Sequence, residues 1–366
     1  MSSVLQVLES PPEIPPAQDD LWSAMDRVFI EHPAFAAVQA RIERLLTRHG
    51  TANALPCIPF VGPTGIGKTT IFRKLRDKYP AQRNARRLLL EDGAILIADH
   101  VPVLFVRMHP KPNAIALLRR MLKALGAPHA EKGKRESLEE RLGLYLEACG
   151  TKLVVLDEGQ RLVDKTGAIT AQDVVDSIKD IHEVVGVSFV ILALPRIRSL
   201  IAEDAQINRR WDEHSIKPYA WGNLKDEEGP KSRANFIGLL VAFQRECRLP
   251  FAEEIDVLDD AVALRFYYAC AGVIGRLKDL LKGAMDIASD DGAAISSVDF
   301  DLLSRAFRQV FQKEMRENRF QDPFSRTWTP CLPPALPDDD ITLARKKTRG
   351  RKKEHDAMVR MVLTKS

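Results

Sequence analysis

The chain has 366 residues, of which 45% are hydrophobic and 28% charged, a balance typical of a globular protein with one large domain or two smaller ones. Its five scattered cysteines include no C-x-x-C pair, which argues against a zinc site or a disulfide framework and favours a reducing, cytoplasmic location. The longest apolar run, VSFVILALP, is far shorter than the roughly 20 residues that span a bilayer, and no signal peptide is predicted. We therefore expect a soluble protein without a membrane partner.

The net charge of +4 is unevenly distributed along the chain. Residues 342–366 carry +7, whereas the residues before them together carry −3. The basic character therefore belongs mainly to a tail that contains the run RKKTRGRKK. Such a tail either binds DNA non-specifically, as basic arms do, or only adds solubility.

Predicted strands and helices alternate through the first part of the chain. A proline-containing lead-in of about 20 residues precedes an amphipathic helix, whose apolar positions recur from Phe35 to Leu46. The predicted strands lack polar alternation, as expected of parallel strands covered on both faces. The fold class is therefore α/β, with a parallel sheet sandwiched by helices. The strands are CIPFVG (57–62), VPVLFVR (101–107), KLVVLDE (152–158), VSFVILAL (187–194) and SIKPYAW (215–221); helices are predicted at 68–78, 113–126, 136–150 and 171–185.

The later part of the chain has a different pattern. From Leu224 to about Lys313 only helical periodicity is visible, which predicts a second, all-helical domain. Residues 319–341 are rich in proline and contain three consecutive aspartates, so we predict a linker before the basic tail.

Residues 60–71, FVGPTGIGKTTI, place a glycine-rich turn between the first strand and a helix, with the spacing G-x-x-x-x-G-K-T. Backbone N–H groups of such a turn and the following helix N-terminus hold phosphate oxygens, and glycine permits their close approach. Lys68 would reach the β- and γ-phosphates, and the Thr69 hydroxyl would bind Mg²⁺. A plain glycine turn is the alternative. The predicted ATP site comprises Gly62, Pro63, Thr64, Gly65, Ile66, Gly67, Lys68, Thr69 and Thr70.

The third predicted strand ends in two carboxylates, within LVVLDEGQ. Asp157 would hold Mg²⁺, usually through water, and Glu158 would orient and polarise the water that attacks the γ-phosphate. A simple kinase does not require the second acid at this position, so the pair favours an NTPase. The alternative is an acidic helix cap.

Two arginines are predicted to contact the nucleotide. Arg210, preferred over Arg209, would stabilise charge on the transferred phosphoryl group of a neighbouring subunit; a solvated surface arginine is the alternative. Arg276, in GVIGRLKDLL, would reach the γ-phosphate from the helical domain; a structural cap or salt bridge is the alternative.

Together these segments resemble the AAA+ ATPases and, within them, the transposition regulators of the TniB/TnsC family. The resemblance covers about residues 22–315 and rests on FIEHPAFAAVQARIERLL, GPTGIGKTT, LVVLDEGQ, NRRW, KPYAW, FQRECRLPF and GVIGRLKDLL. It implies an ATPase that assembles as a ring or filament on double-stranded DNA when ATP is bound. This assembly would link a target-selection protein to a transposase, and ATP hydrolysis would drive its disassembly.

The resemblance also implies a division into domains. These are a lead-in (1–20), an AAA+ nucleotide-binding domain (21–222), a helical lid (223–316), and a linker with the basic tail (317–366). The chain departs from the family pattern at the end of the fourth strand, where Ala193 and Leu194 replace a polar sensor residue. Hydrolysis is then slow, or another residue performs the sensing.

The segment after the second predicted strand supplies the candidate DNA contacts. This segment is RMHPKPNAIALLRRMLK. In the resembling ATPases the corresponding region faces the channel that holds the duplex, so Lys111, Arg119 and Arg120 are predicted to contact phosphates. A solvated helix face is the alternative. The loop HAEKGKRE would add Lys132, Lys134 and Arg135. The resemblance also suggests that the tail is a flexible tether for the transposase.

Two other functions remain open. One is a signalling ATPase with a nucleotide-gated switch, although no internal repeat of the kind such proteins carry is visible. The other is a DNA-binding scaffold that uses ATP only for assembly, which the absent polar sensor favours and Glu158 opposes.

Overall fold

The computed structural model describes residues 33–51, 57–89, 93–164, 168–203, 211–223, 225, 227–247, 249–290 and 296–336. These residues form two compact units. The α/β unit contains the described residues up to Pro218 together with 273–275 and 335–336, and the helical unit contains 219–272 and 276–334. Among the helices that the structure describes, none combines the length and the apolar character needed to cross a membrane.

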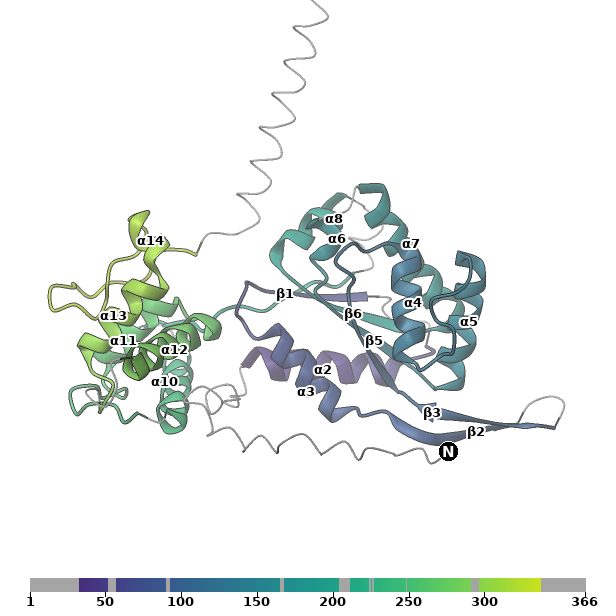
Figure 1. The fold of residues 1–366 in the computed structure, drawn as a ribbon, viewed down its shortest axis with the longest axis horizontal. Coiled ribbons are helices and arrows are strands. Elements are labelled where there is room, and N and C mark those ends of the chain that lie inside the picture. Colours follow the sequence, from purple (N-terminus) through teal and green to yellow (C-terminus); the bar gives the residue numbers. More distant parts are fainter. Residues whose placement is uncertain are drawn as a thin grey trace, which may run out of the picture. The chain divides into compact units, whose positions relative to one another are not determined.

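A five-stranded parallel sheet forms the centre of the α/β unit, with strand order β4-β5-β6-β1-β7 (Figure 1). Every residue of β1, β5 and β6 is buried, which explains why these strands show no polar alternation. The predicted α/β class with a parallel sheet is therefore confirmed. The strands are β1 (Cys57–Val61), β4 (Val103–Arg107), β5 (Leu153–Asp157), β6 (Ser188–Ala193) and β7 (His214–Ser215).

Helices cover both faces of this sheet (Figure 1). Helix α3 packs against β4, β5 and β6, while α4, α5 and α7 pack against one another on the other side. The apolar rhythm predicted at the start of the chain is confirmed, because Phe35, Val38, Ile42 and Leu45 are all buried. The helices are α2 (Pro33–Arg48), α3 (Lys68–Lys78), α4 (Ala114–Ala124), α5 (Arg135–Ala148), α6 (Arg161–Asp164), α7 (Ala168–Val185), the 3₁₀ helix η1 (Pro195–Ile197) and α8 (Arg198–Glu203).

Strand register brings the ends of the central strands to one edge of the sheet. Val61 pairs with Ala193 across β1 and β6, and Arg107 pairs with Asp157 across β4 and β5. Because all of these strands are parallel, the loops after β1, β4, β5 and β6 leave from the same edge. The glycine-rich turn and the two carboxylates are therefore neighbours in space.

An antiparallel strand pair, β2 (Gln82–Leu89) and β3 (Ile95–His100), occupies a region for which the sequence predicted no element. Figure 1 shows it as a ribbon that extends away from the main sheet. Four apolar side chains near its tip are exposed, namely Leu89, Ile95, Leu96 and Ile97. No residue of β2 or β3 is buried among the described residues, so the sequence of the ribbon lacks the apolar alternation that marks a half-buried strand.

The predicted fifth strand is wrong over most of its length. Only two residues, His214 and Ser215, form β7, where they pair with Phe60 and Val61 of β1. Residues 216–221 form no strand. Pro218 lacks the backbone N–H that a continuing ladder would need.

The helical unit consists of five helices in the described residues, as the helical patterns predicted. The side chain of Asp259 accepts hydrogen bonds from the first turn of α11, and Asp299 does the same for α13. Their buried faces are rich in leucine and phenylalanine, including Phe236, Phe243 and Phe266. The helices are α10 (Gly229–Glu246), α11 (Asp260–Cys270), α12 (Ile274–Asp290), α13 (Phe300–Val310) and α14 (Gln312–Arg316).

The prediction of a linker from residue 319 onward is wrong for residues 319–328, which pack within the helical unit. Phe320, Phe324 and Trp328 are each at most 6% exposed, and the ring of Phe324 contacts Phe266 of α11 at 5.3 Å between centroids. The buried carboxylate of Asp322 accepts hydrogen bonds from Ser304 and Arg308 of α13. Aromatic burial therefore outweighs the proline content of this segment. Residues 337–341 of the predicted linker and the basic tail lie outside the described residues.

Candidate functional site: the phosphate loop and its acidic neighbours

The loop after β1 has the geometry of an anion-binding turn. Gly67 caps the N-terminus of α3 with φ +98°, and a Cβ atom built there would meet no atom within 4 Å. Gly65 also has a positive φ, so both positions favour glycine. At Gly62 the reason is packing, because a Cβ would lie 2.9 Å from the backbone oxygen of Ile216. The space beside Gly67 is therefore open, and the backbone N–H groups that begin helix α3 follow directly.

Lys68 lies folded over this loop. Its Nζ donates hydrogen bonds to the carbonyl oxygens of Gly62 and Pro63, both at 2.7 Å. Burial lowers the pKa of Lys68 to about 8, although the carboxylates of Asp157 and Glu158 oppose this shift. A bound phosphate would supply the counter-charge that this buried ammonium lacks. Thr69 and Thr70 lie in the same first turn of α3.

Asp157 is the last residue of β5 and is only 2% exposed. Its Oδ1 accepts a hydrogen bond from the Glu158 backbone N–H at 2.9 Å. Its Oδ2 is buried without a hydrogen bond and lies 3.7 Å from Nη2 of Arg107. Burial raises the pKa of this carboxyl. A buried carboxylate oxygen without a hydrogen bond, next to a phosphate loop, fits a cation such as Mg²⁺ or a water bound to it.

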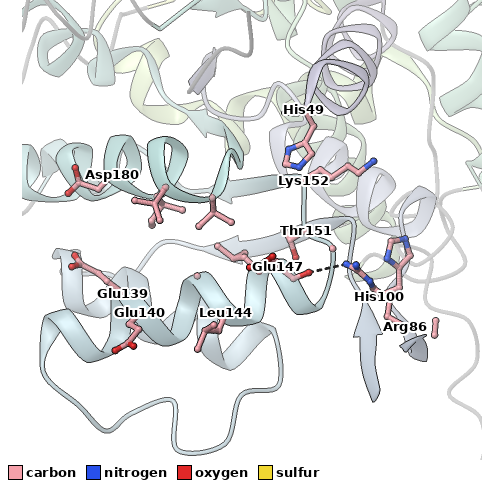
Figure 2. Close-up of a pocket in the computed structure, with 17 residues that line it drawn as sticks. His49, Arg86, His100, Glu139, Glu140, Leu144, Glu147, Thr151, Lys152 and Asp180 are labelled. Carbon is pink, nitrogen blue, oxygen red and sulfur yellow. Dashed lines mark hydrogen bonds between the residues drawn. The ribbon is translucent and has the colours of Figure 1, made fainter. Parts of the chain in front are cut away.

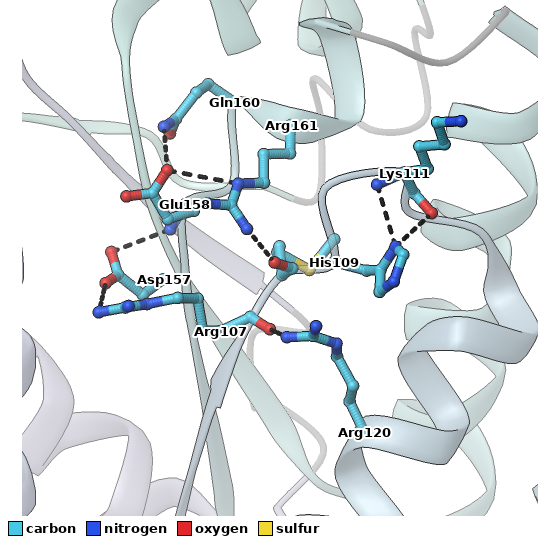
Figure 3. Close-up of polar contacts among 9 residues, drawn as sticks. Arg107, His109, Lys111, Arg120, Asp157, Glu158, Gln160 and Arg161 are labelled. Carbon is cyan, nitrogen blue, oxygen red and sulfur yellow. Dashed lines mark hydrogen bonds and ion pairs between the residues drawn. The ribbon is translucent and has the colours of Figure 1, made fainter. Parts of the chain in front are cut away.

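Glu158 follows directly and adopts a left-handed backbone conformation, with φ +64°. Its carboxylate points toward the residues that follow in the chain. There Oε2 accepts a hydrogen bond from Gln160 Nε2 at 2.9 Å and lies 3.4 Å from Arg161 Nε (Figure 3). The intervening Gly159 permits this turn, because a Cβ there would lie 2.2 Å from the Ile191 side chain on β6. A tight loop thus fixes both acids.

Of the two arginines predicted to contact the nucleotide, the structure describes Arg276 but not Arg210. Arg210 and its neighbour Arg209 lie outside the described residues. Arg276 lies on α12, where its Nη1 pairs with Glu314 at 3.0 Å and its guanidinium stacks on Phe311 at 4.2 Å from the ring centroid. Contact between Arg276 and a phosphate therefore stays a prediction and would require exchange of the Glu314 partner.

The predicted DNA-contacting residues surround the end of β4. Arg120, on α4, donates to the backbone oxygen of Arg107 at 2.7 Å. The Lys111 backbone N–H donates to His109 Nδ1 at 3.0 Å in the loop between β4 and α4 (Figure 3). Arg119 and Arg120 line a cavity of 920 Å³ together with Arg107. Of the three additional candidates, Lys132 and Lys134 are exposed, whereas Arg135 pairs with Glu139.

Sequence reasoning missed three residues of this site. Gln160 and Arg161 hold Glu158, and Arg196 in η1 is near enough to Lys68 for its charge to contribute to the lowered Lys68 pKa. The sequence indicates these residues only by their place in the chain, because Gln160 and Arg161 come just after the acidic pair and Arg196 comes after β6. The contacts of Gln160 and Arg161 with Glu158 are local but depend on the loop conformation, whereas the proximity of Arg196 to Lys68 is a tertiary relationship that spacing does not reveal.

A second large cavity, of 1070 Å³, lies apart from this site. Its lining includes Glu139, Leu144 and Lys152, and none of the predicted site residues (Figure 2). Lys152 directly precedes β5, so the cavity lies toward the opposite edge of the sheet from the phosphate loop.

The parallel sheet, the phosphate loop after its β1 strand and the acidic end of β5 define a P-loop NTPase of the AAA+ class. The family model described as "Bacterial TniB protein" matches residues 22–221, which is more than half of the chain. The chain therefore belongs to the TniB family.

Solved structures similar to this chain include Cdc6p from Pyrobaculum aerophilum and a Walker-type ATPase of Pyrococcus abyssi. Each is 13% identical, with a TM-score of 0.49, over 80% of this chain. The matches cover 71% of the first structure's chain and 76% of the second's. No curated protein matches the chain.

Proposed function

We propose that this protein is an ATP-dependent, DNA-binding regulator of transposition. It would oligomerise on double-stranded DNA with ATP bound, connect a target-selection protein to a transposase, and disassemble on hydrolysis. Family membership supports the link to transposition, and the phosphate loop and acidic pair support ATP hydrolysis.

The observation that carries the enzymatic part is the arrangement of two acids at the end of β5. Asp157 offers a buried oxygen without a hydrogen bond, and Glu158 is partly accessible, with 32% of its side chain exposed. These features support a role for Asp157 in holding a cation and a role for Glu158 in activating a water molecule. Lys68 and the backbone of the phosphate loop would hold the β- and γ-phosphates, and Mg²⁺, when bound, would neutralise charge on the phosphates.

The DNA-binding part rests on the basic side chains at the end of β4. Lys111, Arg119 and Arg120 would contact duplex phosphates, which gives affinity with little sequence preference. Arg210 would act on the nucleotide of a neighbouring subunit, and Arg276 would respond to the γ-phosphate. The tail would tether the transposase.

A scaffold that uses ATP only for assembly is the second candidate, and one observation favours it. Strand β6 ends on the buried, apolar Ala193, at the position where AAA+ ATPases carry a polar sensor. Arg196 is the nearby polar residue that would take over this task in a working ATPase.

ATP turnover measured with and without duplex DNA separates these functions. The proposed regulator hydrolyses ATP and binds duplex DNA in an ATP-dependent way. A scaffold binds DNA with ATP but does not turn it over, and a signalling ATPase turns over ATP without responding to DNA. Absence of ATP-dependent DNA binding would overturn the proposal.

A further inference from the structure

The ribbon β2–β3 carries an exposed apolar face. Cross-strand pairing places Leu89 opposite Ile95 and Arg87 opposite Ile97. Because side chains two residues apart on a strand point the same way, these four side chains lie on one face of the ribbon. Leu89, Ile95 and Ile97 are each more than half exposed. Apolar side chains gathered on one open face mark a place where another surface binds.

The cavity of 1070 Å³ beside α5 and α7 is also apolar. Leu144 of α5 and Val184 of α7 line it, and each is more than half exposed. Of the nine large apolar side chains that are exposed among the described residues, four lie on the ribbon and two in this cavity. The exposed apolar surface of the α/β unit is therefore concentrated in one protrusion and one hollow.

The α5–α7 cavity also contains buried polar atoms without a partner. Thr151 is 3% exposed, and neither its Oγ1 nor Nδ1 of His100 has a hydrogen bond among the described residues. Toward the other end of the cavity lie the exposed acids Glu140 and Asp180 (Figure 2). An occupant therefore needs an apolar surface, hydrogen-bonding groups at one end and positive charge at the other.

The ribbon has these three properties. The exposed Arg87 stands on its apolar face, and in the described part of the chain neither strand pairs with a third, so backbone N–H and C=O groups along its edges are open. The ribbon cannot fill the cavity of its own chain, because Ala85, Arg86 and His100 at its base line that cavity and the tip extends away (Figure 1). Leu89 lies about 10 Å of extended strand beyond Arg86. The occupant is therefore the ribbon of another copy.

We propose that the apolar face of the ribbon of one copy docks in the α5–α7 cavity of a second copy. Because the two surfaces differ, the contact is head-to-tail and repeats from copy to copy, as a closed ring or an open filament. The proposed function does not assign this surface, and the contact needs neither ATP nor DNA. A ribbon tip buries little area, so the association is weak, with a Kd on the order of tens of micromolar.

Sedimentation velocity of the full chain without ATP or DNA tests the contact, over a concentration series that reaches about ten times this Kd. We expect the wild type to associate. Ile97→Glu on the ribbon and Leu144→Glu in the cavity should each weaken association about tenfold or more, because each places an unpaired carboxylate in an apolar contact. Leu258→Glu is the matched control, since Leu258 is a similarly exposed apolar side chain of the helical unit. Its association should match the wild type.

An equimolar mixture of the two variants distinguishes head-to-tail docking from contact between two ribbons. The Ile97→Glu copy retains an intact cavity and the Leu144→Glu copy an intact ribbon, so the mixture should form dimers but no larger species. Cross-linking gives a second readout that needs no disruptive side chain. In a Cys331→Ser background, which removes the exposed native cysteine, Ile97→Cys and Leu144→Cys copies should form a disulfide-linked dimer when they are mixed, and not when either is oxidised alone.

A wild type that stays monomeric throughout the series would overturn the proposal and assign the ribbon to a different protein. Leu144→Glu that associates like the wild type would also overturn it, because pairing between two ribbons does not need the cavity. Thermal unfolding shows whether each variant keeps its fold, and where one does not, absence of the mixed cross-linked dimer decides against the contact. Fluorescence anisotropy with labelled duplex and ATP tests the proposed function separately, since its failure leaves association without nucleotide unchanged.

Discussion

Arg276 and Glu314 form an ion pair inside the helical unit, with 3.0 Å between Nη1 and Oε1 and with both side chains mostly buried. The guanidinium also donates to the backbone oxygen of Ala269 and stacks on Phe311. Burial acts to raise the pKa of Glu314, but a backbone hydrogen bond, followed by the hydrogen bond and the charge of Arg276, outweighs it, so the pKa is lowered. If Arg276 reaches a γ-phosphate, as the sequence predicts, the phosphate must compete with this carboxylate.

Replacing Glu314 by Gln tests that competition. The amide keeps the shape but not the negative charge, so Arg276 should leave it more readily and ATP affinity should rise about three- to tenfold. The measurement is calorimetric titration with a non-hydrolysable ATP analogue. ADP serves as the control ligand, since it lacks the γ-phosphate and its affinity should not change. Equal affinities of wild type and variant for the analogue would assign Arg276 a purely structural role.

The pH dependence of ATP binding should report on Lys68. Its pKa in the free protein is about 8, and bound phosphates raise it, because they favour the charged ammonium. Binding therefore takes up a proton above pH 8, so affinity should fall about tenfold between pH 7 and pH 9. In Lys68→Ala the remaining weak binding should lose this pH dependence. A wild-type affinity that is flat over the same range would contradict a role for Lys68 at the phosphates.

Glu158→Gln should separate binding from hydrolysis. The amide keeps the loop after β5 and leaves Asp157 in place, but it cannot polarise water as a carboxylate does. We expect near-normal ATP affinity, a fall in kcat of about a hundredfold, and long-lived assemblies on DNA. Phosphate release and sedimentation with duplex DNA measure the two effects. Glu140→Gln, an exposed change on α5 away from the phosphate loop, is the control. Wild-type turnover in Glu158→Gln would show that another group activates the water.

The packed segment after α14 should contribute measurably to stability. Phe324 is 3% exposed and contacts the rings of Phe266 and Phe307. Phe324→Ala should lower the free energy of unfolding by about 3 kcal/mol, since it removes a large buried ring and leaves a cavity. Leu332→Ala is the control, because Leu332 is 63% exposed. Chemical denaturation followed by tryptophan fluorescence measures the difference, and equal stabilities of the two variants would show that the segment is not firmly packed.

The parts of the fold that the sequence predicts are those with a strong one-dimensional signal. Strands β1 and β5 are uninterrupted apolar runs that end at glycine or at acids, so both the strands and the site residues beside them follow from the pattern. The ribbon β2–β3 has no buried face and gives no such pattern. The proline content of residues 319–336 suggests a linker throughout, whereas the packing of residues 319–328 depends on three aromatic rings that meet helices distant in sequence.

The same limit applies to the site. Lys68, Asp157 and Glu158 belong to short sequence motifs, and the spacing within those motifs is enough to identify them. The connection of Arg161 to Met108 joins residues 53 positions apart, and it exists only because β4 and β5 are neighbours in the sheet. A contact created by strand order cannot be predicted before the strand order is known.

The exposed ribbon β2–β3 has a practical consequence for work with the purified protein. In the described part of the chain neither strand pairs with a third, so the ribbon offers open backbone hydrogen-bonding groups beside the exposed Leu89 and Ile95. Open edges with apolar side chains are where chains add to one another as aggregates. Aggregation of the concentrated protein should therefore begin at this ribbon. Leu89→Lys or Ile95→Lys is the first substitution to make when a more soluble protein is wanted.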